Sequence, residues 1–213
     1  MIVLSSGHLN YRDPTFEEIS FQVYSALAYG AKSIGYYLYS KSGKHAGYTS
    51  WILEDYVDNS NVVDSLHGPL YSKVKMLNAD IQSMGMILLN LKSIEVIHSS
   101  DYPNNQKNIA ETIFKPNVSN GIVKNIINKY NNNKPLEILI GIYTDNKINP
   151  GIKYLLIVNK DVLYSSEIEL VFNKTYNIYL FNKKESKFTK LSMDQNVKLG
   201  INAGSGELLR LKE

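Results

Sequence analysis

Residues 1–39 read MIVLSSGHLNYRDPTFEEISFQVYSALAYGAKSIGYYLY, and the predicted fold starts from this stretch. The continuous apolar run at residues 1–6 is typical of a strand that is buried on both faces. Thr15 and Glu18 have the spacing of a capping box, and the apolar residues after them recur every three or four positions, as on one helix face. A glycine typical of helix ends follows, and residues 31–39 are rich in aromatic and branched side chains. The stretch therefore predicts a strand, a helix and a second strand parallel to the first.

A second helix is predicted after Pro69. Its apolar stripe recurs at alternating spacings of four and three: Leu70, Val74, Leu77, Ile81, Met84, Leu88 and Leu91. A helix of this length would extend roughly 33 Å at 1.5 Å per residue. A coiled coil would show a similar stripe, but the pattern stops after about three heptads. We therefore interpret the stripe as the buried face of a core helix.

The chain changes character near residue 98. Residues 99–135 are polar and interrupted by prolines, which predicts a linker with one short helix at residues 122–130. Beyond the linker, the apolar pattern changes to a period of two in seven short runs separated by turn residues. We therefore expect an α/β segment at 1–98, the linker at 99–135 and an antiparallel β-sandwich at 136–213.

Composition excludes several classes of protein. The chain has 213 residues, 44% of them hydrophobic and 20% charged, as in soluble globular proteins. Lys and Arg (23) exceed Asp and Glu (20) by only three charges, too few for an electrostatic nucleic-acid binder. No apolar run reaches the roughly 18 residues needed to cross a bilayer, and the N-terminus lacks the pattern of a secretory signal. We expect neither a nucleic-acid nor a membrane partner, and the localisation stays open.

Motifs for metal, cofactor or nucleophilic chemistry are missing from the sequence. The chain has no cysteine, which excludes disulfides, thiolate metal sites and cysteine nucleophiles. The four histidines never occur at helical i, i+4 spacing, so no metal site is predicted. Gly30 and Gly35 have the spacing of a phosphate-binding loop, but Tyr36 stands where that loop needs a lysine. We expect no cofactor.

Position along the chain is more informative than motif. In parallel α/β proteins, ligands bind at the carboxyl ends of the strands. The first strand ends at Ser5, Ser6, Gly7 and His8, and the second at Tyr37, Tyr39 and a loop that carries Tyr48, Trp51, Glu54 and Asp55. Aromatic rings beside polar groups suit a sugar, whose C–H faces stack on rings while its hydroxyls take hydrogen bonds.

A structural explanation of the same residues is equally open. Tyr37 and Tyr39 could fill the interior of a barrel, and Trp51 could pack the loop against the rest of the chain. Glu54 and Asp55 are interpreted as solvated loop residues, since acidic side chains in a polar loop usually face water.

A family resemblance rests on several of these segments. Residues 10–19 (NYRDPTFEEI) and 21–37 (FQVYSALAYGAKSIGYY) resemble the end of a (β/α)8-barrel glycoside hydrolase domain, in beta-galactosidase-like bacterial enzymes related to glycoside hydrolase family 42. The final helix of that barrel and the exit from it are resembled by residues 63–71, 74–81 and 93–98. Its C-terminal β-sandwich is resembled by residues 139–145, 154–159 and 204–209. The resemblance implies an α/β partial (β/α) barrel segment made of the last two βα units, followed by an all-β antiparallel sandwich domain.

The same resemblance implies that most of the barrel lies outside this chain. Glycoside hydrolysis ordinarily needs two carboxyl groups, and Ser5 and Ser6 stand where a retaining member would place its nucleophile. We therefore assign no catalytic residue. Two parallel strands cannot close a barrel, so we expect the missing barrel half or a second copy of the chain to cover the open sheet edges.

The function predicted from the sequence is the C-terminal portion of a glycoside hydrolase that acts in polysaccharide or oligosaccharide breakdown and is not catalytic as an isolated chain. The alternative is a non-catalytic carbohydrate-binding, accessory or structural module, and enzymatic activity stays open. Carbohydrate is the expected partner in either case. The predicted substrate-binding residues are His8, Arg12, Tyr37, Tyr39 and Trp51.

Overall fold

The structure is a computed structural model of the whole chain. It describes residues 1–7, 10–39, 52–57, 63–67, 70–99, 113–114, 121–128, 136–145 and 151–213, and for 53–57, 63–67 and 113–114 only the backbone. Of the predicted site residues, Arg12, Tyr37 and Tyr39 lie in these ranges, whereas His8 and Trp51 lie outside them. Glu54 and Asp55 lie on a described stretch of backbone, and their side chains are not described.

The first strand, helix and second strand form as the sequence predicts. Strands β1 (Ile2–Leu4) and β2 (Gly35–Tyr37) pair in parallel, and helix α1 (Phe16–Ala28) connects them. The capping box is present: the Glu18 N–H donates to Thr15 Oγ1 at 3.2 Å, and the Thr15 N–H donates to Glu18 Oε2 at 2.8 Å. At the other end of α1, Gly30 has φ +89°, the left-handed conformation that terminates helices.

Helix α1 also protects the outer edge of β1. The side-chain amide of Gln22 accepts a hydrogen bond from the Leu4 N–H at 2.9 Å and donates one to the Leu4 carbonyl at 3.2 Å. The amide thus takes the place of a neighbouring strand, because an unpaired edge presents the same N–H and C=O groups.

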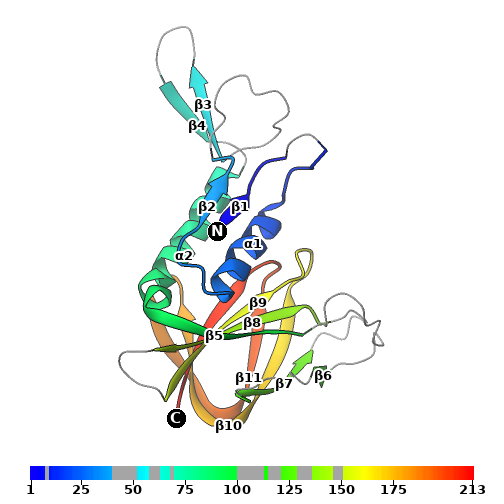
Figure 1. Cartoon of the computed structure of the whole chain (residues 1–213), viewed down its shortest axis with the longest axis vertical. Coiled ribbons are helices and arrows are strands. Elements are labelled where there is room, and N and C mark those ends of the chain that lie inside the picture. Colours follow the sequence, from blue (N-terminus) through cyan, green and yellow to red (C-terminus); the bar gives the residue numbers. More distant parts are fainter. Residues whose placement is uncertain are drawn as a thin grey trace.

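Two antiparallel strands and the long helix follow. Strands β3 (Leu53–Val57) and β4 (Val63–His67) pair with each other, and helix α2 (Tyr71–Asn90) comes next. The core-helix prediction for this segment is confirmed, since Val74, Leu77, Met84 and Leu88 of the apolar stripe are buried. Figure 1 shows α2 running beside α1, above the large sheet.

Most strands belong to one antiparallel sheet of eight strands. Seven of them follow the order β5-β8-β9-β12-β10-β7-β6, and β11 pairs with β10. The bounds of these strands are Leu91–His98 (β5), Ile113–Phe114 (β6), Val123–Asn128 (β7), Ile138–Asp145 (β8), Ile152–Asn159 (β9), Ser166–Asn182 (β10), Lys187–Ile201 (β11) and Gly206–Lys212 (β12).

Strands β10 and β11 are long because each joins two runs that the sequence predicts as separate strands. The first half of β10 pairs with β7 and the second half with β12, and its register shifts between Val171 and Tyr176. Such irregularities bend a strand and increase its twist. The sheet therefore curls, as Figure 1 shows, and it encloses an apolar core to which β5 and β7 to β12 all contribute.

The predicted fold class, a partial (β/α) barrel segment followed by a sandwich domain, is wrong. The described residues contain one two-stranded parallel sheet and two helices, and the remaining strands are antiparallel. After α2 the chain enters β5, which pairs antiparallel with β8 in the large sheet instead of extending the β1–β2 pair. A barrel needs each new strand beside the previous one until the sheet closes. The structure is that of a β-rich protein that also contains a small parallel sheet, the β1–β2 pair.

The predicted short helix at residues 122–130 is also wrong, because these residues contain β7. Short apolar runs do not distinguish helix from strand by pattern alone, and here pairing with β10 decides for a strand. The boundaries at 98 and 135 stay a prediction. The pairing of β5 with β8 joins the first predicted segment to the last through backbone hydrogen bonds.

A second apolar core lies between the two helices and the outer face of the large sheet. It combines Ile19, Val23 and Leu27 of α1 with residues of α2 and with Leu156 and Leu208 of the sheet. Neither helix in the described part of the chain is long and apolar enough to span a membrane.

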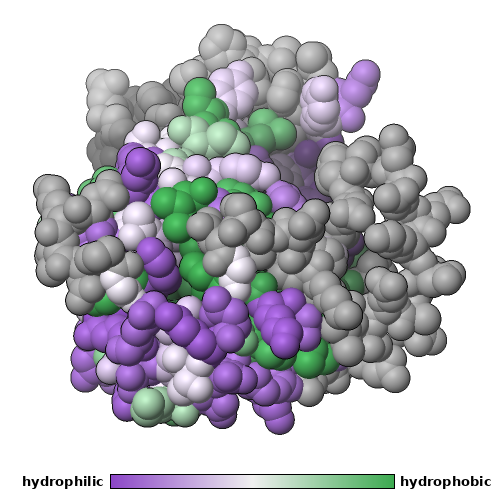
Figure 2. Space-filling model, turned by 60° about the horizontal axis from the view of Figure 1, so that its bottom comes forward, coloured by the Kyte–Doolittle hydropathy of each residue, from purple (hydrophilic) through white to green (hydrophobic). Residues whose placement is uncertain are grey.

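The exposed positions of the edge strand β11 are mostly polar, although Leu191 and Met193 are exposed as well. Its exposed residues include Lys187, Lys190 and Lys198. Figure 2 shows the molecule with the bottom of the Figure 1 view turned forward; in its coloured part, apolar side chains gather near the centre and hydrophilic ones lie below them. Lysines on an edge strand disfavour pairing with another sheet.

Candidate functional site

A cleft beside helix α2 combines tyrosine rings with polar side chains. We call it the tyrosine cleft; it has a volume of about 260 Å³. Tyr39, just after β2, and Ile52 form one side, and α2 forms the other. The α2 residues that line it include Tyr71, Lys75, Asn78 and Gln82.

The wall opposite α2 is built by a backbone hydrogen bond. The Ile52 N–H donates to the Tyr39 carbonyl at 3.2 Å, and the Ile52 side chain is buried. The Tyr39 side chain remains 48% exposed, so its ring is accessible to a ligand. An exposed aromatic ring is what stacking against a sugar requires.

Asn78 is oriented by a partly buried tyrosine of β2. Tyr36 Oη donates a hydrogen bond to Asn78 Oδ1 at 2.7 Å, and burial raises the pKa of Tyr36 to about 12, which keeps the phenol protonated as a donor. Because Oδ1 accepts this hydrogen bond, the Nδ2 group is the donor that Asn78 offers to other partners. Asn78 is therefore a fixed polar contact on the cleft.

The cleft also carries a cation. Lys75 Nζ lies 5.9 Å from the centre of the Tyr71 ring, within the range of a cation–π interaction. An ammonium group can donate three hydrogen bonds. Together with the amides of Asn78 and Gln82, it provides donors for the hydroxyl oxygens of a polyol.

The end of β1 does not contribute open polar groups. Ser5 and Ser6 are fully buried, and their hydroxyls donate to the carbonyls of Leu38 and Gly7, each at 3.1 Å. Ser5 thus connects the end of β1 to the end of β2, and Ser6 makes a local hydrogen bond. The sequence predicts ligand-binding groups at the end of the first strand, but the serine hydroxyls there are used in hydrogen bonds within the fold.

Arg12 lies on the surface and pairs with the first turn of α1. Its Nη1 donates to Glu18 Oε2 at 2.8 Å, and its Nη2 donates to the other carboxylate oxygen of Glu18. The hydrogen bond from Arg12 lowers the pKa of Glu18, so the carboxylate of the capping box stays ionised. Arg12 is absent from the lining of the tyrosine cleft, and so is Tyr37, which is 41% exposed.

Of the predicted substrate-binding residues, Tyr39 is the one that the described structure places on this cleft. His8 and Trp51 lie outside the described residues. The sequence-based prediction did not include the α2 residues of this cleft, because it considered only the apolar stripe of the helix. Tyr71, Lys75, Asn78 and Gln82 recur at spacings of four, three and four, so a polar helical stripe could have identified them.

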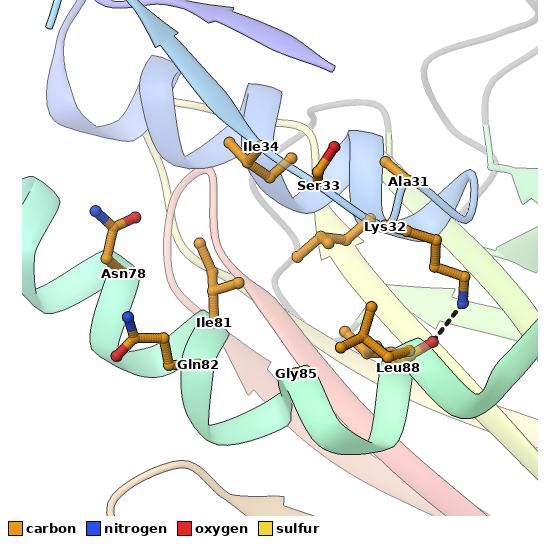
Figure 3. Close-up of a pocket in the computed structure, with 11 residues that line it drawn as sticks. Ala31, Lys32, Ser33, Ile34, Asn78, Ile81, Gln82, Gly85 and Leu88 are labelled. Carbon is orange, nitrogen blue, oxygen red and sulfur yellow. Dashed lines mark hydrogen bonds between the residues drawn. The ribbon is translucent and has the colours of Figure 1, made fainter.

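A second cleft, the glycine cleft, adjoins the first one. It has a volume of about 250 Å³ and also includes Asn78 and Gln82. Figure 3 shows these two amides at one end, Ile34 and Ile81 in the middle, and Lys32 at the other end. Apart from the amides and Lys32, its lining is largely apolar.

Lys32 closes the far end of the glycine cleft. Its ammonium group donates to the carbonyls of Leu88 and Leu91, at the C-terminal end of α2 where carbonyls lack helical partners. Burial lowers the pKa of Lys32. This lysine therefore caps the helix and fixes the connection between α1 and β2 against α2.

Another cleft, of about 430 Å³, lies where the helices meet the loops of the large sheet. Glu17, Tyr24, Asp80 and Asn202 are among its lining residues. The Tyr24 ring packs against Gly206 and is 1% exposed, so it offers no open face for stacking. In the described part of the chain, no group of three or more His, Cys, Asp or Glu side chains could hold a metal ion.

Comparisons with known proteins give one weak structural likeness. No family model matches the chain, and no curated protein matches it. Among solved structures, a variant of a GH27 β-L-arabinopyranosidase from Geobacillus stearothermophilus, in complex with arabinose, matches with 9% identity and a TM-score of 0.28. The match covers 43% of this chain and 20% of that chain. The likeness is therefore to a small part of a glycoside hydrolase, at a level too low to assign a fold.

Proposed function

We propose that this protein is a carbohydrate-binding module that holds a neutral sugar in the tyrosine cleft. The observation that carries the proposal is the meeting of the exposed Tyr39 ring with Asn78, Gln82 and Lys75 on one cleft. An aromatic face takes the C–H side of a sugar ring, and the amide and ammonium groups take its hydroxyls.

The proposal is for binding and not for hydrolysis. The described residues that line the tyrosine cleft include no carboxylate. Glycoside hydrolysis ordinarily uses two carboxyl groups on either side of the scissile bond. An accessory module that brings sugar chains to a hydrolase is consistent with a cleft of this composition.

Sugar titration of the purified chain tests the proposal. The probes are tri- to hexasaccharides of galactose, arabinose, glucose and xylose, with binding measured by calorimetry and by tryptophan fluorescence. Trp51, the one tryptophan of the chain, directly precedes the cleft residue Ile52 in sequence and serves as the reporter. We expect saturable binding of at least one probe.

Two cleft variants and one matched control locate the site. Tyr39→Ala removes the stacking ring, and Gln82→Ala removes an exposed amide; each should raise Kd about tenfold, which corresponds to about 1.4 kcal/mol. Tyr164→Ala removes a tyrosine that is similarly exposed (50%) but lies outside the cleft, and it should leave Kd unchanged. Absence of binding to every probe, or equal losses in Tyr39→Ala and Tyr164→Ala, would overturn the proposal.

A further inference from the structure

Helix α2 has a glycine where helix stability disfavours one. Gly85 lies in the interior of α2, where glycine is about 1 kcal/mol less favourable than alanine. It lines the glycine cleft, one turn after Ile81 and one turn before Leu88 and Leu89. A side chain at Gly85 would meet no atom of the described residues within 4 Å of its Cβ.

Packing therefore does not require this glycine. Gly141 differs, because a Cβ there would lie 2.3 Å from the Ala28 carbonyl oxygen. At Gly85 the missing side chain instead leaves open the floor of the glycine cleft, which Figure 3 shows between Ile81 and Leu88. The space is kept open at a cost in helix stability.

The two clefts differ in chemistry and share residues. Asn78 and Gln82 line both of them. On one side of these amides lie the tyrosines and Lys75, and on the other side lie Ile34, Ile81 and Leu89. A ligand that crosses the amides would meet polar and aromatic groups at one end and aliphatic groups at the other.

We propose that the ligand is an amphiphilic glycoside, with its sugar in the tyrosine cleft and an apolar aglycone, aryl or alkyl, above Gly85 in the glycine cleft. This inference rests on the proposed function, because it uses the same sugar site. The apolar aglycone is chosen as the occupant because the glycine cleft continues directly from the sugar site and its middle is aliphatic. Burial of an aryl or alkyl group against Ile34 and Ile81 favours binding through the hydrophobic effect.

Matched pairs of glycosides test the inference. The probes are the methyl and 4-nitrophenyl glycosides of β-D-galactose, α-L-arabinose and β-D-glucose, with Kd measured by calorimetry. We expect the 4-nitrophenyl member of at least one pair to bind at least tenfold more tightly than the methyl member. Tyr39→Ala should weaken both members of that pair by a similar factor.

A variant that fills the glycine cleft distinguishes the contribution of the aglycone to binding from that of the sugar. Gly85→Leu places a side chain into the open space and should reduce the tenfold difference to less than threefold, while Kd for the methyl glycoside stays the same. Leucine is a good helix former, so the variant should unfold at or above the temperature of the parent chain. Gly85→Ala, the smaller control, should keep most of the difference.

A second variant does not depend on how Gly85→Leu packs. Leu89 lines the cleft and is 55% exposed, so Leu89→Ser should weaken 4-nitrophenyl glycoside binding and leave both folding and methyl glycoside binding intact. Equal affinities for both members of every pair would overturn the inference and leave the proposed function standing. A preference that persists in both Gly85→Leu and Leu89→Ser would also overturn it. Loss of binding to all sugars, oligosaccharides included, would overturn the proposed function itself.

Discussion

Tyr29 and His98 connect the end of α1 to the first strand of the large sheet. Tyr29 Oη and His98 Nε2 are 2.7 Å apart, and the two rings lie 6.1 Å apart between centres. Burial lowers the pKa of His98, and Lys160 lowers it further, whereas Glu137 acts in the opposite direction. Folding thus favours the neutral imidazole.

His98 should make stability depend on pH. Its pKa in the folded state lies below the ordinary value of 6.5, so below pH 6.5 the unfolded chain binds the proton more readily. The contribution of neutral His98 is fully present above pH 6.5 and is lost as the pH falls through the pKa of the folded state. Urea unfolding at pH 7.5 and pH 5 should show a smaller loss of stability in His98→Gln than in the parent chain. Equal losses in the two proteins would show that His98 is not the group responsible.

Helix α1 lies against the large sheet at positions that only glycine can occupy. Besides Gly141 under Ala28, a Cβ at Gly204 would lie 2.1 Å from the Glu17 carbonyl oxygen, and one at Gly206 would lie 2.6 Å from the Tyr24 ring. Gly204 also has φ +62°. The α1 backbone therefore lies close to β8 at Ala28 and to the turn before β12 at Glu17, and the Tyr24 ring packs against Gly206 between them.

Gly141→Ala should lift α1 from the sheet. The contact at 2.3 Å is with helix backbone, which cannot move aside as a flexible side chain would. Overpacking of this kind costs about 1–3 kcal/mol. Urea denaturation should show that loss for Gly141→Ala, while Gly200→Ala in β11, where a Cβ meets no atom of the described residues within 4 Å, should change the unfolding free energy by less than about 0.5 kcal/mol. Similar effects of the two substitutions would contradict this account of the helix–sheet contact.

At the scale of the whole molecule, the described residues form two apolar cores on opposite faces of one sheet. The curl of the large sheet encloses one core, and the helices cover the other (Figure 1). Leu156 and Leu208 belong to the helix side, while their neighbours Leu155 and Leu209 belong to the enclosed side. Since adjacent residues of β9 and β12 contribute to both cores, one core cannot unfold without disturbing the other.

The chain should therefore unfold in one transition. Trp51 directly precedes Ile52 in sequence, and Ile52 belongs to the core on the helix side, so we use Trp51 fluorescence as the probe for that side and circular dichroism for the sheet. We expect the same urea midpoint from both probes, as for a two-state protein. An earlier midpoint for fluorescence would show that the helices and the β1–β2 unit open separately from the large sheet.

Local sequence patterns determined those elements that depend only on residues close together in the chain. The capping box at Thr15 and Glu18, the helix end at Gly30 and the apolar stripe of α2 all depend on neighbours within a few residues, and all are present. The parallel pairing of β1 and β2 follows from the short connection through α1. Tyr39 could be predicted as a candidate site residue because it closely follows β2, and it lines the tyrosine cleft.

Only the tertiary structure decided where these elements lie and what surrounds Tyr39. The apolar stripe of α2 is compatible with a barrel wall or with the face of an antiparallel sheet, since both bury it equally well. The antiparallel sheet follows from the pairing of β5 with β8 and from the close contact of α1 with Gly141. Both contacts join residues that are distant in sequence. The tyrosine cleft likewise arises from the packing of α2 beside Tyr39 and Ile52. The residues next to a side chain in the sequence do not determine which side chains lie opposite it across such a contact.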